Sequence, residues 1–151
     1  MHLLIRAPDV EELPALSELC MRSKAVWGYD AVFMEACRGE LSFDPRDLDS
    51  SKIAVASRGN AVLGVAQVRM AGDEAELLKL FVEPAALRAG VGQALFVWAT
   101  DTVKRLGALR MNIEADPDAA PFYRRLGAHD AGLVPSGSIA GRWLPKLVVE
   151  L

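Results

Sequence analysis

Cysteine is scarce in this chain, which contains only Cys20 and Cys37 among its 151 residues. The two fall in separate predicted helices, without CxxC spacing and without a nearby histidine, so the sequence indicates neither a metal site nor a redox pair. Each is expected to be a small buried apolar residue.

The chain also lacks an excess of positive charge and a long hydrophobic run. Its 17 Lys and Arg against 20 Asp and Glu give a formal net charge of −3, which does not favour a nucleic-acid partner. No basic region followed by an apolar stretch opens the sequence, and no segment reaches the roughly 18 apolar residues of a spanning helix. We therefore expect a cytoplasmic protein with no nucleic-acid and no membrane partner.

What is present is an ordinary globular composition, 52% hydrophobic and 25% charged. A chain of this size can bury about two-thirds of the surface that its unfolded form exposes. No linker, repeat or low-complexity tract divides it, so we expect one domain over residues 1–151.

The hydrophobic pattern predicts a mixed α/β order of elements. A strand at 2–7 precedes helices that start at the N-cap candidates Asp9 and Asp30. The period then changes to two, and a Gly-Asn turn joins two strands into a hairpin. The later elements are expected at 74–84 (strand), 90–106 (the longest helix), 108–115 (strand), 116–127 (short helix, begun by Asp116 and Pro117), and around 133–136 and 143–151 (strands).

Two glycines, Gly90 and Gly92, stand at the start of the longest predicted helix. One interpretation is a tight turn with close packing. The other is an anion site, because the first amides of a helix have no intrahelical acceptor and a missing Cβ lets a diphosphate approach the main chain. Neither a Rossmann nor a P-loop fingerprint is complete, since Leu95 stands where a third glycine would be needed.

The segment "LFVEPAALRAGVGQAL" resembles the acetyl-CoA-binding motif of the GNAT family of N-acetyltransferases, and "IEADPDAAPFYRRLGA" is similar to the second motif of that family. The resemblance implies a GNAT-like fold of the mixed α+β class, with a central, mostly antiparallel sheet flanked by helices. It implies acetyl-CoA as co-substrate. The cofactor-binding residues that it implies are Leu80, Phe81, Val82, Arg88, Ala89, Gly90, Val91, Gly92, Gln93 and Asp116.

The chain departs from the family pattern at two positions. Leu87 stands where arginine or glutamine is usual, with Arg88 one position later. Asp116 stands where many members have an asparagine that contacts the cofactor, and an ionised aspartate cannot donate a hydrogen bond.

The resemblance also implies catalytic roles. Tyr123 matches the tyrosine that protonates the departing thiolate, and a phenol with a pKa near 10 suits a general acid; the alternative is a core tyrosine. Glu114 is the preferred candidate for the general base, ahead of Glu76 and Glu83, while a water chain could replace all three.

The segment "SKAVWGYD" joins the first two predicted helices, next to the acceptor cleft of the resembled fold. Trp27 and Tyr29 could form an apolar wall and Asp30 could attract an ammonium group. Alternatively, Trp27 fills a gap between helices and Asp30 only caps the second helix. In the C-terminal segment, polar groups of Ser136, Ser138 and Arg142 could also face the acceptor.

The sequence thus predicts an N-acetyltransferase that moves the acetyl group of acetyl-CoA to a small-molecule or peptide amine in a ternary complex, with no metal. Two alternatives stay open: a CoA-binding module without turnover, and an enzyme that uses another acyl-CoA or an alcohol acceptor. An exposed sheet edge in the C-terminal strands is compatible with a homodimer.

Overall fold

The computed structural model describes residues 2–151 and contains seven strands, five α-helices and two short 3₁₀ turns. The strands are β1 (Leu4–Arg6), β2 (Lys52–Arg58), β3 (Ala61–Ala71), β4 (Glu74–Val82), β5 (Arg110–Glu114), β6 (His129–Pro135) and β7 (Trp143–Glu150). The helices are α1 (Leu13–Ala25), α2 (Ala31–Leu41), α3 (Asp47–Ser50), α4 (Val91–Arg105) and α5 (Ala120–Arg125), and the 3₁₀ turns are Val10–Glu12 and Pro84–Ala86.

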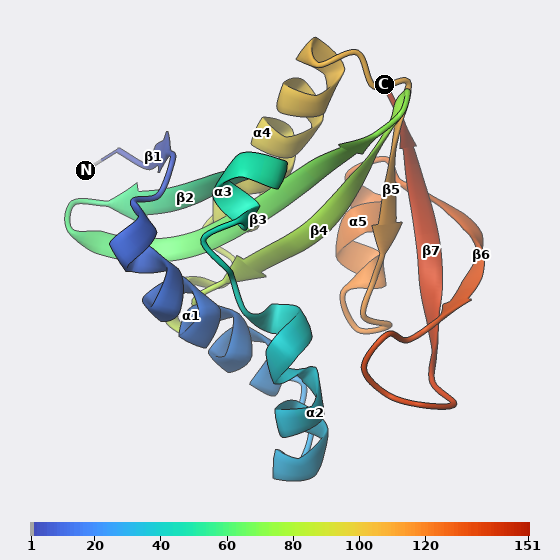
Figure 1. Cartoon of the computed structure of the whole chain (residues 1–151), viewed down its shortest axis with the longest axis horizontal. Helices are drawn as coiled ribbons and strands as arrows, with labels where there is room; N and C mark the ends of the chain where they lie inside the picture. Colours follow the sequence, from blue (N-terminus) through green and yellow to red (C-terminus); the bar gives the residue numbers. More distant parts are fainter. Residues whose placement is uncertain (1) are drawn as a thin grey trace.

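All seven strands form one sheet in the order β1-β2-β3-β4-β5-β7-β6. Every neighbouring pair is antiparallel except β4 and β5, which run parallel. Long helix α4 connects these two strands, as a parallel crossover requires. Figure 1 shows that β4 and β5 start close together and then diverge, so that the sheet opens in its middle.

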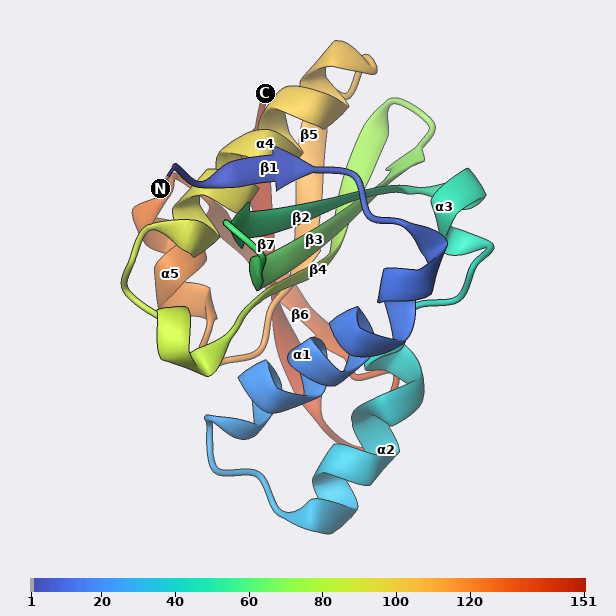
Figure 2. The same cartoon turned by 90° about the vertical axis from the view of Figure 1, so that its left-hand side faces the viewer.

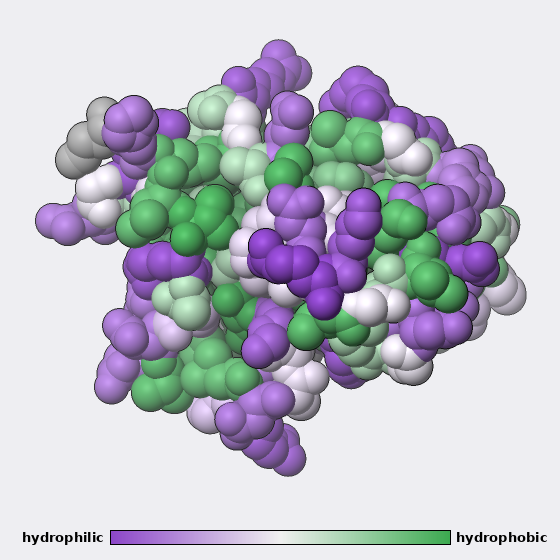
Figure 3. Space-filling model, turned by 90° about the horizontal axis from the view of Figure 1, so that it is seen from above, coloured by the Kyte–Doolittle hydropathy of each residue, from purple (hydrophilic) through white to green (hydrophobic). Residues whose placement is uncertain are grey.

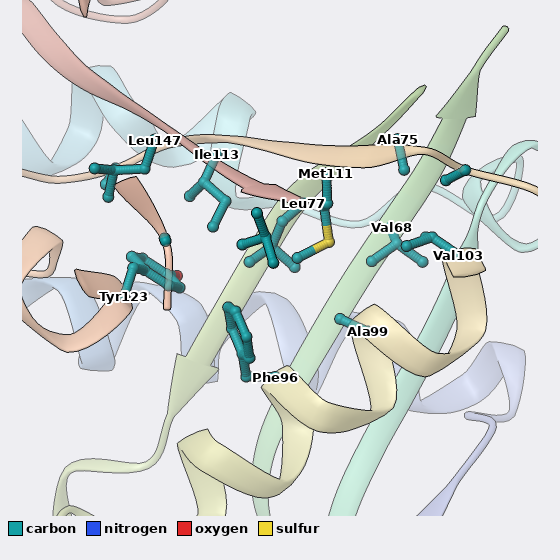
Figure 4. Packing of buried hydrophobic residues seen from close by; sticks show 14 of the residues in the cluster. Val68, Ala75, Leu77, Phe96, Ala99, Val103, Met111, Ile113, Tyr123 and Leu147 are labelled. Atoms are coloured by element: carbon teal, nitrogen blue, oxygen red, sulfur yellow. The ribbon is translucent and has the colours of Figure 1, made fainter. Parts of the chain in front are cut away.

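Helices cover both faces of the sheet (Figure 2). On one face, α4 and α5 pack against alternate residues of β3, β4 and β5, because successive side chains of a strand point to opposite faces. Figure 4 shows Phe96 and Ala99 of α4 directed toward Met111 and Leu77 in this core. On the other face, α1 and α2 bury a second core against β2 and β3.

The predicted fold class is confirmed, and the predicted strands and long helices are present. The first α-helix begins only at Leu13, after a 3₁₀ turn, and Pro14 occupies its first turn. The helix expected from Asp116 begins at Ala120, because residues 116–119 form turns. Short helix α3 was not predicted, since "SFDPRDLDSS" is polar apart from Phe43, Pro45 and Leu48.

Within residues 2–151, no helix combines the length and the apolar composition that crossing a bilayer requires. On the face seen from above, patches of hydrophobic residues are separated by hydrophilic ones (Figure 3).

Candidate active site

The gap between β4 and β5 is the central feature of the site. The two strands pair only where Glu74–Leu77 lies opposite Arg110–Ile113. β4 then continues to Val82 while it remains paired with β3 on its other side. Its last residues therefore have one hydrogen-bonding edge without a neighbouring strand.

The main-chain groups of Leu80 and Val82 face this open edge. The amide of Glu83 donates to Leu63 O at 2.8 Å, so Glu83 points toward β3. Because peptide groups alternate between the two edges of a strand, Phe81 also points toward β3, and Leu80 and Val82 point toward the gap. The sequence predicts Leu80, Phe81 and Val82 alike as cofactor-binding residues. Only the strand register distinguishes the two that face the gap from Phe81, which faces β3.

A cleft of about 1220 Å³ runs through the gap. The segments that border it are β4, the loop before α4, the connection between β5 and α5, and the end of α1 with the connection that follows. The volume somewhat exceeds the roughly 300–1,000 Å³ of typical small-molecule sites, so the cleft is large enough for a ligand of that class. The cleft therefore brings the two sequence motifs to one place.

The loop before α4 borders the cleft. Arg88 has φ 65° and Gly90 has φ 82°, both left-handed, and such conformations turn main-chain N–H groups into an anion-binding concavity. Ala94 N donates to Gly90 O at 3.1 Å as the first α-helical bond. The amides of the first turn, from Val91 to Gln93, consequently have no intrahelical acceptor.

The two glycines serve different purposes. At Gly90 the positive φ favours glycine, and a Cβ would meet nothing within 4 Å. At Gly92 a Cβ would lie 3.1 Å from Phe122 Cζ, so the missing side chain allows α5 to pack against the start of α4. The positive φ of Gly90 and the close packing at Gly92 both fit the interpretation of a tight turn with close packing, and the anion site stays a prediction.

Tyr123 lies on α5, lines the cleft and is 7% exposed. Its ring packs in the core with Phe96 and Phe122. Burial raises the pKa of the Tyr123 phenol well above its ordinary value. The side chain therefore belongs to the core and also borders the cleft, and its role as general acid stays a prediction.

Three glutamates are candidates for the general base. Glu114 ends β5, lines the cleft and lies opposite Lys146 of β7. Glu76 lines the cleft and accepts hydrogen bonds from Arg69 Nη2 at 3.3 and 3.4 Å. Glu83 accepts two hydrogen bonds from Arg22, both 2.8 Å. Among these three, Glu83 is held most firmly in an ion pair.

On the acceptor side, Trp27 is 48% exposed and borders the cleft. Asp30 caps α2, since its Oδ1 accepts from Phe33 N at 2.8 Å. Tyr29 is half-buried and donates a hydrogen bond of 2.7 Å to Asp116 Oδ2. Asp116 is thus brought together with the acceptor-side segment.

Lys79 was not identified from the sequence, although it borders the cleft. Its Nζ donates to Gln67 Oε1 at 3.0 Å and lies 4.7 Å from the centre of the Phe43 ring. Burial lowers the pKa of this ammonium group. A lysine in an otherwise apolar strand pattern is a sequence signal that could have marked it.

Comparison with known proteins agrees with this geometry. The chain superposes on PaiA N-acetyltransferase from Thermoplasma acidophilum in complex with coenzyme A (TM-score 0.81, 18% identity, 100% of both chains covered). A GCN5-related N-acetyltransferase from Rhodopseudomonas palustris gives a TM-score of 0.82 at 18% identity, covering 100% of this chain and 97% of that one. YncA from Salmonella typhimurium, solved with its cofactor acetyl-CoA, gives 0.71 at 21% identity over 99% and 94% of the two chains.

At these identities the superpositions establish the fold. No curated protein matches the chain by sequence. Residues 49–127, which hold both motifs, match the family model described as "Acetyltransferase (GNAT) domain". The chain therefore belongs to the GNAT family of acetyltransferases.

Proposed function

We propose that residues 1–151 form a single N-acetyltransferase domain, which transfers the acetyl group of acetyl-CoA to a primary amine by direct attack in a ternary complex. The observation that carries this proposal is the open edge of Leu80 and Val82, which lies in the same cleft as the free amides at the start of α4. An extended amide chain that ends in a diphosphate fits such a combination.

Residues of the chain would hold the cofactor at two places. The main-chain amides of residues 88–93, of which those of Val91 to Gln93 have no intrahelical acceptor, suit the diphosphate, and Arg88 adds a positive charge beside them. The N–H and C=O groups of Leu80 and Val82 suit the pantetheine amides, as a neighbouring strand would. The cofactor supplies an activated thioester.

Two groups of the chain serve the transfer. The amide of Leu80 faces the gap and can donate to the oxygen of the acetyl carbonyl as negative charge develops there. The hydroxyl of Tyr123 can donate a proton to the departing thiolate, because its raised pKa keeps it protonated at neutral pH. Glu114, which lies beside the cleft, is our candidate to accept the proton of the amine, directly or through water.

Thiol release from acetyl-CoA in the presence of an amine panel tests this function. The panel holds n-pentylamine, 1,5-diaminopentane, 5-aminopentanoate and a short peptide with a free N-terminus, with calorimetric titration of CoA beside it. We expect CoA binding and acceptor-dependent thiol release with at least one class of amine. CoA binding without release from any amine would favour a binding module instead.

The same assay with propionyl-CoA and longer thioesters tests acyl preference, and an alcohol panel tests the acceptor atom.

A homodimer and a cytoplasmic location stay predictions. For the dimer, β6 is an edge strand of the sheet, and Leu133 within it is exposed. The molar mass in solution tests that prediction.

A further inference from the structure

Asp116 is the centre of a cluster that joins three segments far apart in the sequence. Its Oδ2 accepts from Tyr29 OH at 2.7 Å, from Lys24 Nζ at 3.2 Å and from Arg142 Nη2 at 3.4 Å. Lys24 ends α1, Tyr29 lies between α1 and α2, and Arg142 directly precedes β7. One carboxylate therefore links both acceptor-side connections to the segment that leads into α5.

The cluster is largely shielded from solvent. The side chains of Lys24, Asp116 and Arg142 are 13%, 10% and 19% exposed. Ion pairs with such low exposure are screened less by salt and cost more to break than pairs on the surface. This cluster is therefore built to hold its segments in place.

Aromatic contacts reinforce the same arrangement. The rings of Tyr29 and Phe33 stack with centroids 4.0 Å apart. The guanidinium of Arg142 lies 5.1 and 4.9 Å from the centres of these rings and donates to Tyr29 OH at 2.6 Å. A planar cation over an aromatic face is attracted by the ring, so these contacts add to the ion pairs of the cluster.

The connection between β6 and β7 is fixed at further points. Ser138 Oγ donates to Glu40 of α2. Ser136 Oγ accepts from the amides of Ser138 and Ile139, and Ser136 N donates to Arg142 O at 2.7 Å. This connection is thus an ordered loop that lies against α2.

Both oxygens of Asp116 are engaged within the chain, since Oδ1 accepts from Asp118 N at 2.9 Å. The asparagine that many family members have at this position donates a hydrogen bond to the cofactor, and an ionised carboxylate cannot do so. Lys24, Trp27 and Asp116 nonetheless all border the cleft. The residue therefore acts at the edge of the cleft, through the segments it holds.

We infer that Asp116 is a positioning residue, which holds residues 26–30 and 136–142 in place on the acceptor side of the cleft. It thereby sets the affinity for the acceptor and not the affinity for the cofactor. The inference rests on the proposed function for its kinetic part. Its structural part, that one carboxylate holds two segments in place, does not depend on turnover.

Asp116→Asn tests it, because the variant keeps the shape of the side chain and removes its charge. If the held arrangement falls to about a tenth of its population, the apparent acceptor affinity falls by the same factor, so we expect an acceptor KM about tenfold higher. The Kd for CoA should stay within about twofold. Tyr29→Phe, which keeps the ring stacking and removes the hydroxyl, should raise the acceptor KM by a smaller factor.

Hydrogen exchange provides a readout that needs no substrate. In Asp116→Asn, amides of residues 26–30 and 136–142 should exchange faster, while those in the middle of α4 keep their rates. Asp116→Glu restores the charge and should recover part of the protection. Asp101→Asn serves as the control, because Asp101 is an exposed aspartate on α4 and its substitution changes the net charge by the same amount.

The outcomes are distinct. A loss of CoA affinity in Asp116→Asn at unchanged acceptor KM would overturn the inference and assign Asp116 to the cofactor. Unchanged exchange in both segments would overturn it as well. If the wild-type protein releases no thiol with any amine, the proposed function fails, and the exchange experiment still decides whether Asp116 holds the two segments.

Discussion

The ring of Tyr123 lies edge to face against the ring of Phe122, with centroids 5.2 Å apart and an angle of 73° between the planes. Phe122 in turn occupies the space beside Gly92, at the start of α4. The residue that we assign as general acid is thus fixed, through one ring, to the helix end that we assign to the diphosphate. The two parts of the cleft to which we assign these roles therefore both pack against Phe122.

Tyr123→Phe separates the hydroxyl from this packing. The variant keeps both ring contacts, so CoA binding and stability should be close to those of the wild type. Loss of a general acid typically costs 10²–10⁴-fold, and we expect kcat to fall by about 10²-fold. Stopped-flow thiol release and calorimetry measure the two quantities. Full activity in this variant would leave Tyr123 with a packing role alone.

The pH dependence of the wild type provides a second check on Tyr123. Burial raises the pKa of its phenol, so the acid form persists to a pH above the ordinary phenol pKa of about 10. We therefore expect no decline of kcat from Tyr123 between pH 7 and about 9.5. A basic limb in that range that disappears in Tyr123→Phe would contradict the assigned pKa direction.

Gly90→Ala tests whether the left-handed residue shapes the anion site. Alanine at a positive φ costs about 1–2 kcal/mol, and relief of that strain would turn the loop amides away from the cleft. We expect a Kd for CoA at least about fivefold higher, which corresponds to about 1 kcal/mol. Isothermal calorimetry with CoA measures it.

Gly107→Ala is the matched control for this experiment. Gly107 has φ 98° and also has nothing within 4 Å of its Cβ position, but it lies beyond the other end of α4. Its substitution should cost similar stability and leave the Kd for CoA unchanged. Equal loss of CoA affinity in both variants would indicate a general effect of destabilisation.

Sequence periodicity was sufficient for most of the fold, for physical reasons. Strands β2 and β3 alternate residues between two cores, and α4 repeats apolar residues on one face, so local pattern and tertiary burial agree. The turn chemistry of Gly59 and Asn60 also matched the hairpin that forms. Helix α3 was missed because its few residues carry no periodic signal.

The site was less accessible to sequence reasoning, because its properties come from pairing. The open edge at Leu80 depends on where β5 stops pairing with β4, which no local pattern encodes. The contacts of Asp116 come from residues 26 to 92 positions away. The position of Lys79 within β4 could have been noticed in the sequence, but its contacts with Gln67 and Phe43 follow from the tertiary structure.

Gly64→Ala is expected to destabilise the fold. A Cβ at Gly64 would lie 2.9 Å from Leu95 Cδ1 and 3.0 Å from Phe81 O, so α4 packs directly on the backbone of β3. Overpacking of this kind costs about 1–3 kcal/mol. Urea denaturation measures the change.

Gly39→Ala provides the contrast, since Gly39 lies in α2 with nothing within 4 Å of its Cβ position. Replacing a helical glycine with alanine should stabilise by up to about 1 kcal/mol. A lower free energy of unfolding for Gly64→Ala and a higher one for Gly39→Ala would support the packing argument. A neutral Gly64→Ala would mean that α4 can shift away from β3 without cost.

Glu12 should contribute stability that is lost in acid. Its carboxylate accepts two hydrogen bonds of 2.8 Å from Arg6 and one of 2.9 Å from Asp9 N. The Arg6 contacts, followed by the Asp9 amide, lower the pKa of Glu12 from 4.5 to about 2. A lowered pKa stabilises the folded state above the unfolded pKa, and this contribution disappears as the pH falls from about 4.5 to about 2.

Glu12→Gln should therefore unfold more easily than the wild type at pH 7, by about 1 kcal/mol because the pair is partly open to solvent. The difference between the two proteins should shrink as the pH falls toward 2, where about half of the wild-type carboxyl groups are also protonated. Glu11→Gln, at the exposed neighbouring position, should show no such convergence. Urea midpoints at several pH values measure both, and a difference that stays constant down to pH 2 would show that the ion pair with Arg6 is not its source.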